Sequence, residues 1–512
     1  MKMTHETEVL KREDLLPVFD DLCKTVVDGA RQGLAAHVME LAVWERVLQI
    51  GYRALAMFFA LSGNGDQGEA ITLPDGRTCQ RLEETHDRRY VSIFGEFILE
   101  RAVYGSREGQ KIEFVPLDNR LQLPESAFSY VLQDWDQSFC VEQAFGPSAE
   151  VIKRILGLRQ SVDSLERMNV DMAKQVLDYR EARPAPGPEE EGEILVTSAD
   201  GKGIVMRRSE EEKAKKQPKK QPKTKSHRRK GEKANQKRMA TVGAVYTVDR
   251  YLRSAEEVVA ALFRDKEPRP SQKRPEPQHK HVWASLPVSG DDDEMISGMN
   301  VVYTWLSEEV EGRRRDPCQE LVHLADGQES LWEARKEHLP ENTVDILDLL
   351  HVTPRIWQAA HVFHKEGSDE AEQFVRERLL RILRGESDLV VRGLRVMGSK
   401  RVLTGAKKKT LRKVCAYLDA NRHRMHYDTY LAKGYPIASG VIEGACRHLV
   451  KDRMERAGMH WRPEGAQAML DVRSIYVEGA WQQYQAYRIE SETSRLYPFR
   501  ELVEGPNYNL AA

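Results

Sequence analysis

Long apolar runs and paired cysteines are both absent from this chain. No apolar stretch approaches the roughly 18 to 20 residues that a membrane-spanning helix needs, so we expect no membrane partner. The N-terminal sequence from Met1 to Glu6 has no apolar core, and we expect no signal peptide. The six cysteines form no Cys-x-x-Cys pair. This spacing argues against a zinc ribbon and predicts free thiols in a reducing, cytoplasmic compartment.

Motifs of nucleophilic catalysis are also missing. The sequence contains no Gly-x-Ser-x-Gly and no Cys/His pair typical of a covalent mechanism. Its net charge is only -2, although 31% of the residues are charged. This composition is typical of a protein rich in helix. At 512 residues the chain is too long for one compact core, which predicts two to four domains.

Two aspartates follow short apolar runs. Residues 194–196 form an apolar run, and Asp200 comes soon after it, directly before Gly201. Residues 320–327 repeat the pattern, with Asp326 placed between an alanine and a glycine. A buried strand that ends in an aspartate on a glycine turn would carry the carboxylate to the edge of a sheet. We expect both acids at such an edge, within reach of a metal ion.

A third acid, Glu443, lies at the start of a predicted helix. Carboxylates are hard oxygen ligands that suit Mg²⁺ or Mn²⁺. Two such ions about 3.5 to 4 Å apart activate an attacking oxygen and stabilise a leaving oxygen in phosphoryl displacement. We therefore predict that Asp200, Asp326 and Glu443 are catalytic metal ligands for two ions, in an enzyme that needs no nucleophile of its own.

Asp348 competes with Asp326 for the role of second ligand. It lies within residues 343–352, an apolar run that predicts a strand, so a buried Asp348 needs a partner. That partner would be a metal ion, an arginine or His351. We favour Asp326 because a glycine follows it, as one follows Asp200. Asp348 and His351 remain alternative catalytic or supporting residues.

Two basic residues follow Glu443 at helical spacing. Arg447 and Lys451 come four and eight residues later, so a regular α-helix would place all three on one face. Cations beside a carboxylate keep it ionised, and they would also hold DNA phosphates. A salt-bridged surface helix is the alternative interpretation.

Residues 126–182 predict a helical region that resembles a helix-turn-helix. A short helix at 149–156 leads through a glycine turn into a longer helix at 161–177. The polar residues near the start of the second helix would then contact DNA in the major groove. These residues are Gln160, Ser161, Ser164 and Arg167. An ordinary helical hairpin is the alternative.

A lysine-rich segment at 207–238 interrupts the first acidic region. It has almost no apolar residues and contains two Gln-Pro-Lys repeats, so we expect it to be disordered when free. Basic segments neutralise phosphates without recognising sequence. The predicted phosphate contacts are Lys219, Lys220, Arg228, Arg229 and Lys230. A solvated loop without a partner is the alternative.

The order of these segments predicts an α/β protein, α+β overall, with a mixed sheet flanked by helices. The Pro/Gly/Glu segment at 183–192 is the clearest boundary, and the first helices form a packing or dimerising pair. We predict a helical N-terminus at 1–62, a small sheet at 63–125, the helix-turn-helix at 126–182, a linker at 183–192, the core at 193–352, an all-α insertion at 353–434, the second part of the core at 435–490, and a tail at 491–512.

Four segments resemble bacterial insertion-sequence transposases of the Kra type, which are DDE enzymes related to the Mutator-like superfamily. The segments are residues 196–203, 324–327, 346–352 and 435–461, the last containing Ser-Gly-Val-Ile-Glu-Gly. The resemblance implies an RNase H-like core with a helical insertion before the glutamate helix. It implies that Asp200, Asp326 and Glu443 form the metal-binding triad. Asp348 and His351 match the Asp-x-x-His signature of Mutator-like enzymes.

The function that we predict is DNA transposition. The enzyme would cut DNA at terminal inverted repeats and join the freed 3′-hydroxyl to target DNA. We expect a homodimer or higher oligomer, because two ends must be cut, in the cytoplasm of a bacterium and associated with the nucleoid. The alternatives are an RNase H-like nuclease without strand transfer and a non-catalytic DNA-binding relic of a transposase.

Overall fold

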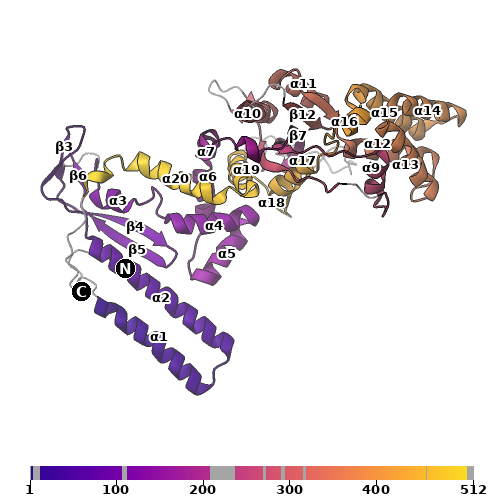
Figure 1. The fold of residues 1–512 in the computed structure, drawn as a ribbon. Helices are drawn as coiled ribbons and strands as arrows, with labels where there is room; N and C mark the ends of the chain where they lie inside the picture. The colour runs from indigo at the N-terminus through magenta and orange to yellow at the C-terminus, as the bar shows by residue number, and fades with distance from the viewer. Residues whose placement is uncertain are drawn as a thin grey trace, which may run out of the picture. The chain divides into compact units, whose positions relative to one another are not determined.

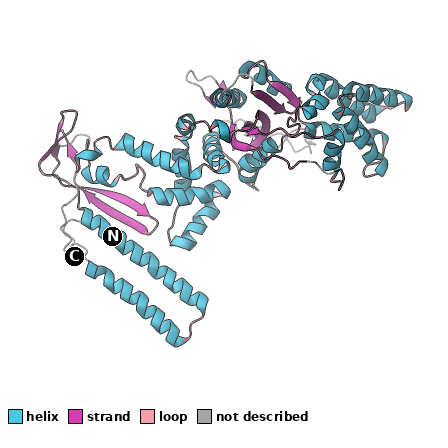
Figure 2. Cartoon of the chain, viewed as in Figure 1, coloured by secondary structure: helices cyan, strands magenta, loops and turns pink. Residues whose placement is uncertain are grey.

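The chain forms two compact units in a computed structural model (Figure 1). The structure describes residues 2–3, 12–106, 112–207, 237–268, 272–289, 295–314, 319–456 and 458–503. One unit contains Met1–Tyr179 and Trp481–Ala512, and the other contains Arg180–Ala480. Helices predominate, with strands in both units (Figure 2). Within the described ranges, no helix combines the length and apolarity needed to cross a membrane.

The first unit begins with a long helical hairpin. Helix α1 (Arg12–Gln32) and helix α2 (Ala36–Ser62) run antiparallel (Figure 1). Gly33, with a φ of 66°, lies in the turn between them. A left-handed backbone suits glycine there, because it has no Cβ to clash. The helical N-terminus expected from the apolar periodicity is therefore present.

Two small sheets of three strands each follow the hairpin. Their orders are β1-β5-β4 and β2-β3-β6. The strands are β1 (Lys2–Met3), β2 (Ala70–Thr72), β3 (Thr78–Arg81), β4 (His86–Ser92), β5 (Gly95–Arg101) and β6 (Tyr104–Gly105). The small sheet predicted at 63–125 does not extend through the described residues from 112 on. Phe114 forms only an isolated bridge, because helix α3 (Pro116–Leu121) begins there with its proline at the first position.

A group of helices completes the first unit. They are α4 (Tyr130–Glu142), α5 (Phe145–Leu156), α6 (Val162–Ala173), α7 (Val176–Ala182), which crosses into the second unit, α20 (Trp481–Leu496) and the short η4 (Arg500–Leu502). The predicted helix at 149–156 starts earlier, at Phe145, because Gly146 and Pro147 fit a first helical turn. The predicted helix at 161–177 is divided between α6 and α7.

The second unit is built on a mixed sheet of five strands in the order β13-β12-β7-β8-β9. The strands are β7 (Ile194–Val205), β8 (Lys237–Val248), β9 (Gln278–Ser285), β12 (Glu320–Ala325) and β13 (Val344–Leu347). Strands β7, β8 and β9 are antiparallel, whereas β12 and β13 run parallel to β7. The expected mixed sheet is confirmed.

Helices cover this sheet, and close packing requires a glycine at its centre. A Cβ on Gly243 of β8 would lie 2.6 Å from Val302 Cγ1 of helix α10. The covering elements before the insertion are α9 (Ala255–Phe263), α10 (Gly298–Arg313) and α11 (Glu329–His338), with the short hairpin β10 (Val288–Ser289) and β11 (Met295–Ile296).

The segment expected as a linker packs on the second unit. Its short helix η1 spans Pro188–Glu190. Arg183 forms an ion pair of 2.9 Å with the buried Glu478, and Arg313 binds both carboxylate oxygens of Glu191 at 2.8 Å. Bidentate pairs of this kind fix geometry as well as charge. The segment is thus held at both ends.

An all-α insertion follows β13, as expected. Its helices are α12 (Leu349–Phe363), α13 (Asp369–Leu383), α14 (Ser387–Lys400), α15 (Gly405–Asn421), η2 (Arg422–Arg424) and α16 (Tyr427–Ala432). After it come α17 (Gly440–Ala445), the π-helix η3 (Cys446–Lys451), α18 (Asp452–Met454) and α19 (Pro463–Glu478). The predicted strand at 343–352 is wrong beyond Leu347, because helix α12 begins at Leu349.

Candidate active site

The register of three parallel strands places three aspartates in one row. Ala199 of β7 pairs with Ala325 of β12, which pairs with Leu347 of β13. The next residues on the three strands are Asp200, Asp326 and Asp348, listed from the centre of the sheet to its edge. Neighbouring strands lie about 4.8 Å apart. Asp200 and Asp326 are therefore neighbours, as predicted, and Asp348 extends the row rather than replacing Asp326.

Asp200 lies inside strand β7 rather than at its end. We predicted a glycine turn after it, but β7 continues to Val205 in antiparallel pairing with β8. Asp200 is instead where the parallel pairing with β12 stops. Its Oδ1 accepts a hydrogen bond from the Gly201 N–H at 2.7 Å, and its Oδ2 accepts one from the Cys446 thiol at 3.5 Å. Partial burial raises the pKa of Asp200, and the Asp326 carboxylate raises it further.

Asp326 follows the last residue of β12, where we expected it. Its Oδ1 accepts a hydrogen bond from the Gln328 N–H at 2.8 Å. Close packing explains the glycine that follows it, because a Cβ on Gly327 would lie 2.3 Å from Cε2 of Tyr417. Helix α15 of the insertion thus reaches back to this end of the acid row through Tyr417.

Asp348 is the most enclosed acid of the row, with 1% of its surface exposed. It is the N-cap of α12, so its Oδ1 accepts from the Leu350 N–H at 2.8 Å. Its Oδ2 accepts from the Ser439 N–H at 3.3 Å and lies 3.7 Å from His351 Nδ1. The partner that a buried Asp348 needed is therefore a set of backbone donors together with His351.

A chain of hydrogen bonds ties the glutamate helix to the sheet. Ser439 caps α17, accepting from the Ile442 N–H at 3.3 Å. Its hydroxyl lies 3.1 Å from that of Ser198, which donates to the Leu324 carbonyl at 2.6 Å. Because the Ser198 hydroxyl donates its proton to the Leu324 carbonyl, the Ser439 hydroxyl is the donor in its bond with Ser198. This chain fixes the start of the Glu443 helix beside the strands that carry Asp200 and Asp326.

Glu443 is exposed but lies within electrostatic range of the acid row. Partial burial raises its pKa, and Asp348 and Asp200 raise it further. The Asp348 carboxylate raises the pKa of His351, with added contributions from Asp326 and Asp200. One neighbourhood therefore contains four carboxylates and one imidazole, and like charges there favour either protons or a bound cation.

The donor chemistry of the row fits a hard divalent cation, because carboxylate oxygens are the ligands that Mg²⁺ and Mn²⁺ prefer. Across the parts of the chain that the structure describes, no group of three His, Cys, Asp or Glu side chains surrounds a common point where an ion would sit. Asp200 and Asp326 instead accept bonds from the nearby N–H groups of Gly201 and Gln328. Ion binding would require these side chains to turn away from those donors.

The helix after Glu443 changes its winding. Residues Cys446–Lys451 form a π-helix, a form that is common at functional sites. The α-helical spacing from which we predicted a shared face for Glu443, Arg447 and Lys451 therefore does not hold through this segment. Both cations are exposed, and Arg447 lies 3.8 Å from Asp452.

The polar residues predicted to contact DNA from the helix-turn-helix lie in the first unit. Ser161 caps α6 by accepting from the Ser164 N–H at 3.0 Å, and the two hydroxyls are 2.8 Å apart. Gln160 donates to Asp136 of α4 at 2.8 Å. Arg167 is exposed. Three of the four thus stabilise the helical packing, and their contact with DNA stays a prediction.

The lysine-rich segment falls almost entirely outside the described residues. Lys219, Lys220, Arg228, Arg229 and Lys230 all lie in the range 208–236. Their predicted phosphate contacts stay predictions.

A basic face on the helical insertion was missed in the sequence. It consists of exposed cations on α14 and α15 that form no ion pair with any described residue. These cations are Arg392, Lys400, Lys407, Lys408, Lys409, Arg412 and Lys413. The run of three lysines at 407–409 was a visible signal. The lysine run forms part of a larger basic surface only because α14 and α15 pack side by side.

Comparisons with known proteins give little further information. No family model matches the chain, and no curated protein matches it. Two chains of solved structures do match. One comes from a Drosophila P element transposase strand transfer complex, with 11% identity, 77% of this chain and 86% of that chain covered, and a TM-score of 0.22. At that score the similarity assigns no function.

The hydroxyl chain between Ser198 and Ser439 should be measurable as a coupling energy. We expect Ser198→Ala and Ser439→Ala each to lower the free energy of unfolding by about 1 kcal/mol, since each loses a buried hydrogen bond and Ser439 also caps a helix. The double variant should show a coupling of about 0.5 kcal/mol or more in urea unfolding. Ser254, which caps α9 by accepting from the Glu257 N–H, is the matched control. The change in the free energy of unfolding for Ser254→Ala should add to that for Ser198→Ala. If the changes for Ser198→Ala and Ser439→Ala were also additive, the hydrogen bond between these two hydroxyls would be refuted.

Proposed function

We propose that this protein is a DDE-type DNA transposase that cuts and joins DNA with divalent metal ions. The observation that carries the proposal is the row of aspartates at one end of three parallel strands, with the Glu443 helix hydrogen-bonded to the same strands. Neighbouring carboxylates raise the pKa of Asp200 and the pKa of Glu443, and acids crowded in this way are suited to binding cations.

Asp200, Asp326 and Glu443 would hold the ions, and Asp348 would position the site. Asp348 is enclosed and bonded to two backbone N–H groups, so it has little freedom to bind an ion. Asp200 and Asp326 are more open, and Glu443 is exposed. When bound, Mg²⁺ or Mn²⁺ would supply the Lewis acidity that activates an attacking oxygen and stabilises a leaving one. His351, with its raised pKa, would add positive charge beside the row.

DNA would be held by cations on both units. The basic face of α14 and α15 would neutralise phosphates, and the helix-turn-helix of the first unit would recognise the element ends. In the first step, water attacks a phosphodiester at the element end and frees a 3′-hydroxyl. In the second step, that hydroxyl attacks a target phosphodiester, and the target strand leaves with its own 3′-hydroxyl.

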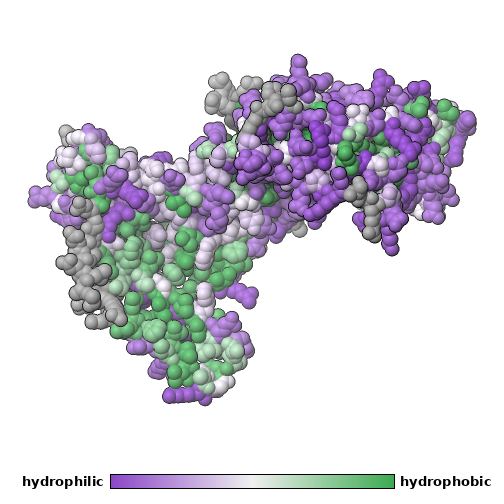
Figure 3. Space-filling model, in the orientation of Figure 1, coloured by the Kyte–Doolittle hydropathy of each residue, from purple (hydrophilic) through white to green (hydrophobic). Residues whose placement is uncertain are grey.

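A second copy of this chain would bind through the helical hairpin. Hydrophobic residues gather over α1 and α2 (Figure 3). The exposed apolar side chains include Phe19 at 53%, Leu41 at 58% and Phe58 at 49%. Apolar patches of this kind mark interaction surfaces, and a two-fold axis lets one patch pair with itself.

The carboxylates are tested by metal-dependent cleavage. We expect the wild type to nick DNA carrying the sequences that flank its coding region, with Mg²⁺ or Mn²⁺ and not with a chelator. Asp200→Asn, Asp326→Asn and Glu443→Gln should each slow cleavage by about 100-fold or more, since several kcal/mol of transition-state stabilisation would be lost. Glu333→Gln, at an exposed acid of α11, is the control and should cut normally.

Joining of the cut end to a target plasmid separates a transposase from a nuclease without strand transfer. Absence of metal-dependent nicking by the wild type would indicate the non-catalytic relic. Wild-type cleavage by Asp200→Asn would refute the proposed ligand set.

The basic face is tested by the salt dependence of DNA binding. We expect the double variant Lys407→Gln/Lys408→Gln to bind DNA more weakly, because two phosphate contacts are lost. The slope of log affinity against log salt should fall by about 0.9 for each lost contact. Fluorescence anisotropy at four salt concentrations measures both quantities. Lys24→Gln/Arg53→Gln on the hairpin removes the same charge and should leave the slope unchanged. An unchanged slope for the first pair would exclude the basic face.

The hairpin is tested by the mass of the protein in solution. We expect light scattering to give at least twice the chain mass for the wild type. Phe19→Ser/Leu41→Ser should yield a monomer, because the exposed apolar contact is lost. Leu389→Ser, a similarly exposed apolar residue of α14, should leave the mass unchanged. A wild-type monomer, or an oligomer that survives the double change, would contradict the assignment.

A further inference from the structure

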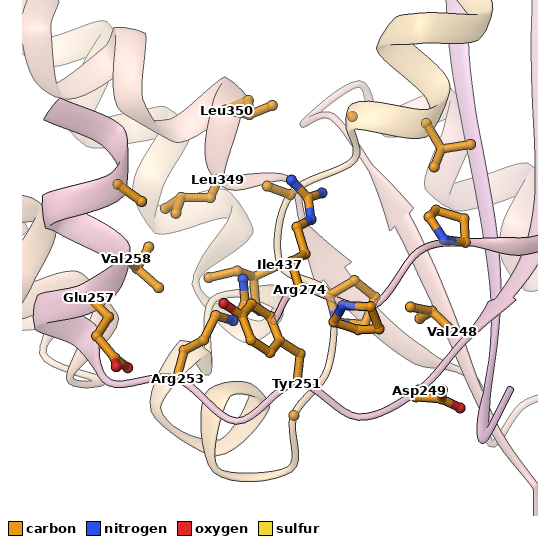
Figure 4. Close-up of a pocket in the computed structure, with 18 of the residues that line it drawn as sticks. Val248, Asp249, Tyr251, Arg253, Glu257, Val258, Arg274, Leu349, Leu350 and Ile437 are labelled. Carbon is orange, nitrogen blue, oxygen red and sulfur yellow. The ribbon is translucent and has the colours of Figure 1, made fainter. Parts of the chain in front are cut away.

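Helix α12, which begins at the acid row, has an apolar side and a polar side. Leu349 and Leu350 of its first turn line a cavity of about 450 Å³ (Figure 4). His351 instead lies 3.7 Å from the Asp348 carboxylate. Arg355 comes four residues after His351, about one helical turn, so the two side chains leave the helix on the same side. The polar side of α12 therefore carries two basic residues outward from the acid row.

The Arg355 guanidinium lies over an aromatic ring that helix α15 supplies. Its central carbon is 4.6 Å from the centre of the Tyr417 ring, a cation–π distance. The hydroxyl edge of that ring meets Gly327, because a Cβ there would lie 2.7 Å from Tyr417 Cζ and 2.8 Å from its oxygen. Gly327 directly follows Asp326. Tyr417 thus connects Arg355 to the second acid of the row.

Arg355 has no anionic partner in the parts of the chain that the structure describes. It is half-buried, and within those parts its guanidinium forms neither a hydrogen bond nor an ion pair. Arg313, by contrast, uses its donors on the Glu191 carboxylate at 2.8 Å. A guanidinium stacked on a ring is held in place while its N–H groups stay available in its own plane. Arg355 therefore offers these donors to an incoming anion.

The anion that suits this position is a phosphate of DNA. A phosphodiester brought to a row of carboxylates is repelled by them, and an arginine beside the row offsets part of that repulsion. The planar guanidinium also matches two phosphate oxygens. We propose that Arg355 binds a backbone phosphate next to the scissile one and holds that strand beside Asp326. The inference rests on the proposed function, because the phosphate must belong to DNA held at the acid row.

The Tyr417 ring explains why the contact is to a neighbouring phosphate. The guanidinium lies over the ring and Gly327 meets the hydroxyl edge, so the ring separates Arg355 from the segment that carries Asp326. The scissile phosphate would lie on the ions held by the carboxylates, which leaves the next phosphate of the strand for Arg355. Tyr417 is then a positioning residue, because it orients Arg355 and needs no contact with DNA.

The inference is tested with DNA in which one phosphate at a time is made neutral. Duplexes with the flanking sequence would carry a single methylphosphonate at successive phosphates on either side of the scissile one. On unmodified DNA we expect Arg355→Gln to slow single-turnover cleavage by about 10- to 100-fold, because a charged donor group is lost. At one modified position the wild type should slow by a similar factor, and Arg355→Gln should slow no further, because the contact is already absent.

Three further variants separate this contact from general effects. Arg355→Lys keeps the charge without the planar fork and should recover part of the cleavage rate. Tyr417→Leu removes the stacking and should slow cleavage less than Arg355→Gln, with the same dependence on position. Arg378→Gln removes an arginine that lies 3.7 Å from the centre of the Phe374 ring, and this matched control should cut normally. Thermal unfolding checks the folding of each variant. If Arg355→Gln is unfolded, Arg355→Lys at the modified position still decides.

The ratio of the wild-type rate to the Arg355→Gln rate decides the outcome. A ratio that is the same at every modified position would overturn the phosphate contact and leave Arg355 with a structural role. Equal rates of the two proteins on unmodified DNA would overturn it as well. In both cases the wild type still cuts DNA, so only this inference fails. If the wild type neither binds nor cuts DNA, the proposed function fails and the inference fails with it.

Discussion

The parallel register of β7, β12 and β13 is the constraint on which the site depends. Because Ala199, Ala325 and Leu347 share one row, the acids that follow them must be neighbours. Side-by-side carboxylates repel each other, and the protein offsets this by supplying donors to each: the Gly201 N–H and the Cys446 thiol, the Gln328 N–H, and the N–H groups of Leu350 and Ser439. A bound cation would replace several of these donors at once.

The same constraint gives the acids different environments. Asp348 lies where β13 turns directly into α12, so its carboxylate is used to cap a helix and to hold Ser439. Asp326 is followed by a loop, and Asp200 lies in a strand whose partner β12 has ended, so both are more open. Environment therefore distinguishes the enclosed Asp348 from the more open Asp200 and Asp326, although all three are aspartates.

The local part of this arrangement was predictable from sequence. An apolar run followed by an acid marks the end of strand pairing, and this placed Asp200 and Asp326 together. The length of β7 was not predictable, because its last residues are held by pairing with β8 across a long insertion. A short apolar run fits helix and strand equally well, so the sequence of residues 343–352 predicts one strand where the structure has a strand and the start of a helix. The strand ends and helix α12 begins at this point because the Asp348 side chain caps the helix. The basic face depends on how α14 packs against α15, which periodicity does not encode.

The segment 434–441 connects the separate parts of the site through its backbone. Its Gly434 carbonyl accepts from the Tyr251 N–H at 2.9 Å, and its Ile437 carbonyl accepts from the Leu349 N–H at 2.9 Å. Gly434 has a φ of 72°, and a Cβ there would lie 2.9 Å from the Tyr251 nitrogen, so the contact requires glycine. Two residues after Ile437, Ser439 binds Asp348 and caps the Glu443 helix. This one segment therefore connects the turn after β8 to Asp348 and to the start of the Glu443 helix.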